Sequence, residues 1–192
     1  AGSIEFLGYA KDEAEATVLG IVTGGESAER AEAGAEVEIV LSATPFYAEQ
    51  GGQVGDTGTI RTADGGLIAV KNTHFPVPGV IAHIGHVESG AVAVGETVTA
   101  SIDVMRRERI RRNHTATHIL HWALRRILGE HVRQSGSYVA PERLRFDFTH
   151  FEAVSAEQLR RIEEMANHKV MENHPVRNYE TSLATAREMG VT

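Results

Sequence analysis

The sequence has no cysteine, five prolines and one tryptophan among its 192 residues. The lack of cysteine excludes a disulfide framework and any complete thiolate metal site within the chain. No uninterrupted apolar run approaches the ~18 residues of a membrane-spanning helix, and no charged segment followed by an apolar leader is present. We therefore expect a soluble, cytoplasmic protein without a membrane partner. With 42% hydrophobic and 23% charged residues, the composition is ordinary for one or two globular domains of roughly 150 residues each.

Residues 1–103 have the pattern of a β-domain. Short runs rich in Val, Ile and Thr alternate with glycine-containing turns, which is the spacing of a small barrel or sandwich. We expect a small β-barrel, with strands at 16–23, 35–42, 67–74, 80–88 and 97–103.

The periodicity becomes helical at residue 104, which we interpret as the start of a second domain covering 104–192. Asp103 stands where an N-cap is needed and Gly129 where a C-cap is needed, so the pattern predicts a helix over 104–128. The fold class is therefore α+β.

The remaining elements alternate between strands and helices. Alternating apolar and polar residues predict a hairpin of strands at 133–140 and 143–148. Ser155 and Gln158 have capping-box spacing, which predicts a helix over 156–173 that ends before Pro175. A third strand at 176–181 and a last helix capped by Ser182 follow.

Two histidines one helical turn apart, His114 and His118, are the most informative local feature. At 3.6 residues per turn both imidazoles project from one face and can bind one cation. Position 115 is Thr, where a zinc metalloprotease would have a glutamate base, so that chemistry is disfavoured. Zinc takes about four ligands, and the sequence offers no compact pattern for the others. Either residues beyond Thr192 complete the site, or the pair is a partly buried, hydrogen-bonded structural feature.

The second feature is the glycine-rich segment 44–58, with four glycines in eight residues. Glycine allows positive φ and close approach of the backbone to a ligand. The segment lacks the Gly-Lys-Ser/Thr ending of a phosphate loop and the spacing of a dinucleotide fingerprint. Gly51, Gly52 and Gln53 are similar to the tripeptide that release factors place at the tRNA 3′ end. A tight barrel turn is the alternative interpretation.

Basic residues gather just before the histidines. Residues 105–133 contain eight arginines and two glutamates, while the whole chain carries −7. A concentrated basic segment in an acidic protein is typical of phosphate contacts, for which we name Arg111 and Arg112. A solvated helix face with local ion pairs remains the alternative.

Three segments together resemble the central part of the alanyl-tRNA synthetase family: TPFYAEQGGQVGDTG at 44–58, RNHTATHILHWALRRILGEHVRQSGSYV at 112–139 and LRFDFTHF at 144–151. Their order and spacing match over nearly the whole chain. The resemblance implies a β-barrel related to the second domain of translation factors, followed by a truncated α/β editing domain of the type shared with threonyl-tRNA synthetases. It also implies hydrolysis of Ser or Gly wrongly attached to the alanine tRNA.

The resemblance assigns roles to individual residues. His114 and His118 match the first two zinc ligands, Gln134 a polar residue of the editing pocket, and Gly51, Gly52 and Gln53 the glycine-rich motif facing that pocket. The Cys-x-x-x-His motif that completes zinc binding in the family is missing here, so the chain has only a half-site. The class II motifs for ATP, Mg and alanine are also missing, so we place the ligase reaction elsewhere in the parent enzyme. The implied partners are the acceptor end of tRNA(Ala) and the rest of the synthetase chain.

A site selective for seryl-tRNA needs a polar partner for the serine hydroxyl. The candidates are Gln134, Thr115 and Thr117, with Gln134 first as the catalytic-site residue. We expect Gln134→Ala in a complete protein to weaken hydrolysis of seryl-tRNA.

Two other interpretations remain open at this point. A stand-alone editing hydrolase would begin near the glycine-rich barrel and contain its own Cys-x-x-x-His motif. A non-catalytic RNA-binding module would use the arginines to contact tRNA and the histidines only for packing. For the isolated chain we expect weak or no zinc binding and negligible activity.

Overall fold

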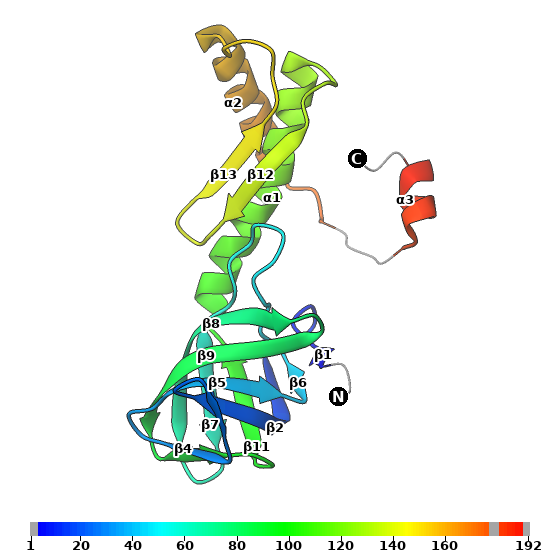
Figure 1. Cartoon of the computed structure of the whole chain (residues 1–192). Helices are drawn as coiled ribbons and strands as arrows, with labels where there is room; N and C mark the ends of the chain where they lie inside the picture. The colour runs from blue at the N-terminus through cyan, green and yellow to red at the C-terminus, as the bar shows by residue number, and fades with distance from the viewer. Residues whose placement is uncertain (1–3, 177–180, 190–192) are drawn as a thin grey trace.

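The computed structural model describes residues 4–176 and 181–189, and its largest part is a closed β-barrel (Figure 1). The strands pair in the order β11, β7, β8, β9, β5, β2, and β2 pairs in turn with β11. These six strands are β2 (Glu13–Thr23), β5 (Glu36–Leu41), β7 (Gly58–Thr62), β8 (Leu67–Val77), β9 (Val80–Ser89) and β11 (Thr97–Ile102). Five short strands decorate the barrel: β1 (Glu5–Phe6), β3 (Glu26–Ala28), β4 (Arg30–Glu32), β6 (Ala43–Thr44) and β10 (Ala91–Ala93). The predicted small β-barrel is therefore confirmed.

Alternation of side chains explains why these segments form a barrel. In β5, Val37, Ile39 and Leu41 are almost completely buried, while the residues between them are more exposed. Because side chains in a strand point alternately to opposite faces, one face of each strand fills the interior. The barrel thus has its own hydrophobic core.

One barrel strand, β7, was not predicted. It begins at Gly58, the last glycine of the glycine-rich segment, and holds β11 on one side and β8 on the other. Gly58 therefore lies in a strand and not in the turn or ligand-binding segment expected for 44–58, because glycine also fits where strands approach closely. A Cβ at Gly58 would meet the backbone of Ile102 at 2.8 Å.

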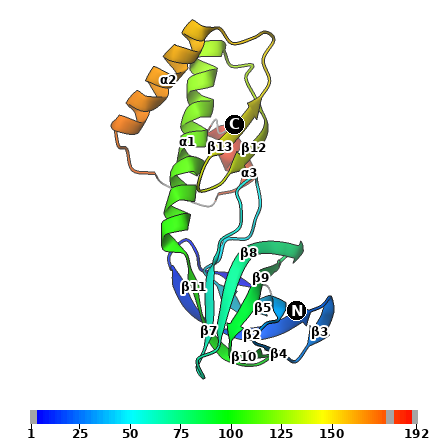
Figure 2. The same cartoon turned by 90° about the vertical axis from the view of Figure 1, so that its left-hand side faces the viewer.

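Helix α1 (Val104–Leu128) continues directly from the last barrel strand and carries the chain away from the barrel (Figure 2). The side chain of Asp103 accepts a hydrogen bond from the Arg106 amide at 3.0 Å, and Gly129 follows the last turn with φ of 118°. Both predicted caps are confirmed, because each satisfies backbone groups that a helix end leaves unpaired.

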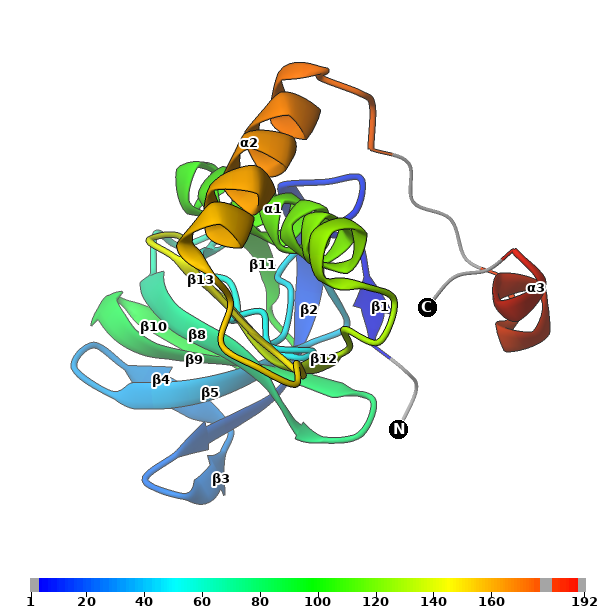
Figure 3. The ribbon, with the colours of Figure 1, turned by 90° about the horizontal axis from the view of Figure 1, so that it is seen from above.

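The second half of the chain packs a hairpin and a helix on α1. The hairpin consists of β12 (Gln134–Val139) and β13 (Leu144–Phe148), as predicted. Helix α2 (Ala156–Met171) lies across α1 (Figure 3) and begins with the predicted capping box. It ends two residues before the predicted end at 173. A second hydrophobic core holds these elements together, with Ala123, Leu124, Val132 and Ile162 at its centre.

The C-terminal part contains a short helix, α3 (Leu183–Glu188), capped by the Ser182 hydroxyl as predicted. Residues 177–180 of the strand predicted at 176–181 lie outside the described residues, and its end residues Val176 and Thr181 have no regular secondary structure. Within the described residues, no helix has the length and apolarity needed to cross a membrane.

Candidate functional site

The glycine-rich segment forms a long loop, residues 45–57, that leaves the barrel between β6 and β7 and reaches up to the hairpin (Figure 2). We call it the glycine loop. At its tip, Gln50 and Gln53 exchange backbone hydrogen bonds of 3.2 and 3.0 Å. Gly51 and Gly52 between them have φ of 60° and 85°. Positive φ at both central positions defines the tightest hairpin turns and favours glycine there.

The tip of the glycine loop pairs with the edge of β12. The amide of Val139 donates to the Gly52 carbonyl at 2.8 Å, and the amide of Val54 donates to the Val139 carbonyl at 3.1 Å. A Cβ on Gly52 would clash with the backbone and side chain of Ser137. The loop therefore acts as a third strand beside the hairpin, and Gly52 allows the close approach.

This pairing brings Gln53 against the histidine helix. The side-chain oxygen of Gln53 lies 2.6 Å from Nδ1 of His114, 61 residues along the chain, and Gln53 is only 6% exposed. Two features that the sequence presents separately, the glycine-rich tripeptide and the histidine pair, thus meet in one site.

The two histidines stack on each other, with ring centroids 5.2 Å apart and planes inclined by 19°. His114 is half-buried and His118 is exposed. Burial, together with the charge that His118 would carry, holds the pKa of His114 below its usual value. The His114 ring is therefore neutral at neutral pH, which is the form that ligates metals.

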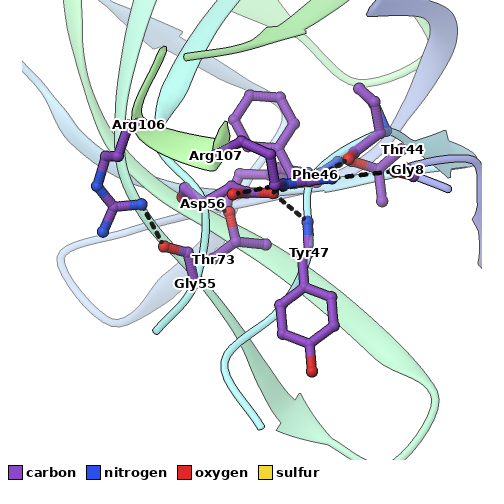
Figure 4. Close-up of polar contacts among 11 residues, drawn as sticks. Gly8, Thr44, Phe46, Tyr47, Gly55, Asp56, Thr73, Arg106 and Arg107 are labelled. Carbon is purple, nitrogen blue, oxygen red and sulfur yellow. Dashed lines mark hydrogen bonds and ion pairs between the residues drawn. The ribbon is translucent and has the colours of Figure 1, made fainter. Parts of the chain in front are cut away.

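The base of the glycine loop is fixed by a buried ion pair between Asp56 and Arg107 (Figure 4). Arg107 Nε lies 2.9 Å from both carboxylate oxygens, and a second guanidinium nitrogen, Nη2, contacts the same carboxylate. The guanidinium also donates to the carbonyls of Gly8 and Pro45 at 3.0 and 2.9 Å. The first turn of α1 is thereby locked to the loop and the barrel.

Sequence reasoning missed this pair. Arg107 was counted in the basic segment, whereas it is 8% exposed and fully engaged. Its neighbour Arg106 also turns inward, donating to the Gly55 carbonyl at 2.8 Å. The glycine loop contains two acidic residues, Glu49 and Asp56, and no local pattern links either of them to Arg107.

The structure does not bring the other predicted residues into this contact. Gln134 is exposed at the start of β12, at the opposite end of that strand from Val139. Thr117 is buried and its hydroxyl donates to the Asn113 carbonyl at 2.9 Å, within the helix itself. Thr115 is half-buried on α1. Their proposed roles toward substrate stay predictions.

Arg111 and Arg112 are exposed on α1 near the histidines. Arg111 pairs with Glu108 at 2.6 Å, and their side chains are 68% and 43% exposed. Surface pairs of this kind contribute little to stability. The two guanidinium groups thus remain accessible to an anionic ligand.

The donor chemistry of the histidine pair fits one half of a zinc site. Among residues 4–176 and 181–189 no group of three or more His, Asp or Glu side chains is placed to hold a metal. Nearby His121 packs instead on Phe146, with ring centroids 5.0 Å apart. The two imidazoles would need ligands from outside the described residues.

Comparison with known proteins places these features in a family. The family described as tRNA synthetases class II (A) matches residues 2–106, more than half of the chain. Proteins called alanine–tRNA ligase are similar along nearly all of it. The one from Pelotomaculum thermopropionicum is 49% identical over 98% of this chain, and the one from Chelativorans sp. is 50% identical over 91%. The chain spans only 21% and 20% of their lengths.

Proposed function

The chain belongs to the alanyl-tRNA synthetase family, and from this we propose that its second half, residues 104–192, is part of an editing domain. In this proposal residues 1–103 form the translation-factor-like barrel that accompanies it. The region removes Ser or Gly wrongly attached to tRNA(Ala), by hydrolysis of the aminoacyl ester. Attachment of alanine with ATP and Mg is assigned to other parts of the longer relatives.

The contact between Gln53 and His114 carries this proposal. A glycine turn that permits close approach and the His114–His118 pair lie side by side. Arg111 and Arg112 are exposed on the same helix. In this proposal the phosphates of a tRNA 3′ end contact the arginines, and its aminoacyl ester lies beside the histidines.

The chemistry needed at such a site is modest, because an aminoacyl ester is already activated. The chain's residues would grip the 3′ end, position the ester and exclude bulk water. The Gly51–Gly52 turn presents backbone without side chains toward the hairpin, and Gln134 or Thr115 would offer the serine hydroxyl a hydrogen bond. A zinc ion held by His114 and His118 would polarise the ester or activate water when bound.

We propose that the remaining zinc ligands come from outside these 192 residues. The relatives are about five times longer than the chain, and the described residues supply only two ligands. The isolated chain should therefore bind zinc weakly and hydrolyse little.

The test uses a longer protein that contains this chain and the rest of its editing domain. His114→Ala and His118→Ala should each lower hydrolysis of Ser-tRNA(Ala) by at least about 100-fold, in line with loss of a metal-activated step. Charging of tRNA(Ala) with alanine should stay unchanged. His168→Ala, on an exposed part of α2, is the matched control.

Full hydrolysis by both histidine variants would contradict the proposal. Retained tRNA binding together with no hydrolysis by the unaltered protein would favour a non-catalytic tRNA-binding module. Efficient hydrolysis by the 192-residue chain alone would favour a stand-alone hydrolase.

A further inference from the structure

We propose that Gln53 is a positioning residue that holds His114 as a single tautomer, with the proton on Nδ1 and the lone pair on Nε2. The proposal depends on the proposed function only for the use of that lone pair as a metal ligand. The positioning itself is a property of the metal-free chain.

The hydrogen bond between the two side chains fixes which nitrogen carries the proton. An amide oxygen can only accept, so Nδ1 of His114 must donate across the 2.6 Å contact. A neutral imidazole has one proton, and Nε2 is then left with its lone pair. No hydrogen bond to Nε2 is found within the described part of the chain.

Burial and backbone pairing restrict the movement of Gln53. The residue is 6% exposed, and its backbone is paired on both sides, with Gln50 across the turn and with Val139 of β12. The loop behind it is fixed by the Asp56–Arg107 pair. A side chain on such a backbone has little freedom to release His114.

The consequence for a metal site follows from general principles. Ligating histidines almost always donate their second N–H to a carboxylate, carbonyl or water, which sets the tautomer and the ring orientation. Here the acceptor belongs to the barrel, whereas the histidine belongs to α1. The glycine loop thus gives the barrel a direct part in preparing the histidine.

The deciding experiment measures the tautomer of His114 in the metal-free 192-residue chain. Long-range ¹H–¹⁵N correlation spectra of ¹⁵N-histidine protein distinguish the two neutral tautomers, and His114→Asn identifies the signals. The spectra are recorded about two pH units above the usual histidine pKa. The unaltered chain should show the proton on Nδ1.

Variants separate this bond from general packing. Gln53→Met should shift His114 toward the tautomer with the proton on Nε2. Gln53→Glu keeps an acceptor oxygen and should keep the proton on Nδ1. Gln50→Met, an exposed change on the same turn, should leave the spectrum unchanged. Protection of the Val139 amide against exchange reports whether the loop stays seated in each variant.

A proton on Nε2 in the unaltered chain, or an unchanged tautomer in Gln53→Met, would overturn the proposal. Titration with Zn²⁺ alone then tests whether this tautomer favours zinc binding. Gln53→Met should weaken binding about 10- to 100-fold, whereas Gln50→Met should not. If the unaltered chain and the longer protein both fail to bind zinc while the tautomer result holds, the proposed function fails and the positioning role stands.

Discussion

Asp56 and Arg107 form an ion pair that is almost completely removed from water: Asp56 is 1% exposed and Arg107 is 8% exposed. Removing one partner of a buried pair leaves an uncompensated charge, which costs about 3–5 kcal/mol. We expect Asp56→Asn to lower the free energy of unfolding by that amount in urea titrations.

Glu36→Gln is the control for this change. Glu36 pairs with Lys71 at 3.0 Å, with more than half of each side chain exposed, so its loss should lower the free energy of unfolding far less than Asp56→Asn does. Similar losses for both variants would show that the Asp56–Arg107 pair does not fix the loop.

His83 in β9 is a second buried polar group. Its Nε2 lies 2.7 Å from the Thr44 hydroxyl and its Nδ1 lies 2.8 Å from the Ile39 carbonyl. Burial lowers the pKa of His83 from 6.5 to about 4. The unfolded chain therefore takes up the proton first as the pH falls.

The sign of the pH effect follows from this difference. The contribution of neutral His83 to stability is complete above pH 6.5 and is lost as the pH falls from 6.5 toward 4. The total loss in the free energy of unfolding is about 3 kcal/mol. Urea titrations across this range should show the decline, and His83→Gln should flatten it. An equal slope in both proteins would assign the decline to other groups.

The sequence identified both halves of the candidate site but not their contact. The spacing of His114 and His118 and the glycines at 51 and 52 are local signals. The bond from Gln53 to His114 joins residues 61 positions apart, and no local pattern encodes it. Arg107 was misinterpreted for the same reason, because its partner lies in the distant glycine loop.

At the scale of elements, the glycine turn and β12 form one unit. Gly51 and Gly52 both have positive φ, but a Cβ would meet Ser137 only at Gly52 and would meet no atom within 4 Å at Gly51. Gly51→Ala should cost about 1–2 kcal/mol from backbone strain alone, while Gly52→Ala adds a clash with the hairpin.

We expect the Val139 amide, which donates to Gly52, to exchange at least about tenfold faster in Gly52→Ala than in Gly51→Ala, a difference of roughly 1.4 kcal/mol. Hydrogen exchange followed by NMR measures it. Equal rates would mean that the loop is not held against β12 through Gly52.

Elements with strong local signals were predicted well. Both ends of α1 were correct, because Asp103 and Gly129 satisfy the helix ends directly. Strand β7 was missed because its five residues follow a run of glycines and show little alternation. Its place in the barrel depends on pairing with β8 and β11, which only the closed sheet specifies.

At the scale of the whole molecule, an acidic protein of net charge −7 carries exposed arginines beside the candidate site. Under the proposed function, binding of the tRNA 3′ end should therefore weaken as salt rises. Arg112→Ala should weaken it and reduce the slope of log affinity against log salt by roughly 1.

Fluorescence anisotropy over a salt series measures this slope. Arg160→Ala is the control, because Arg160 is also an exposed arginine but lies on α2 and not on α1. An unchanged slope in Arg112→Ala would show that Arg112 does not contact the tRNA phosphates.

The glycine loop also limits how the barrel and α1 can be exchanged between proteins. A chimaera that transplants α1 and the hairpin onto another scaffold would leave behind Gly52, whose carbonyl accepts from the Val139 amide, and Asp56, the partner of Arg107. Any exchange of modules between proteins of this family should therefore carry the barrel, α1 and the hairpin together.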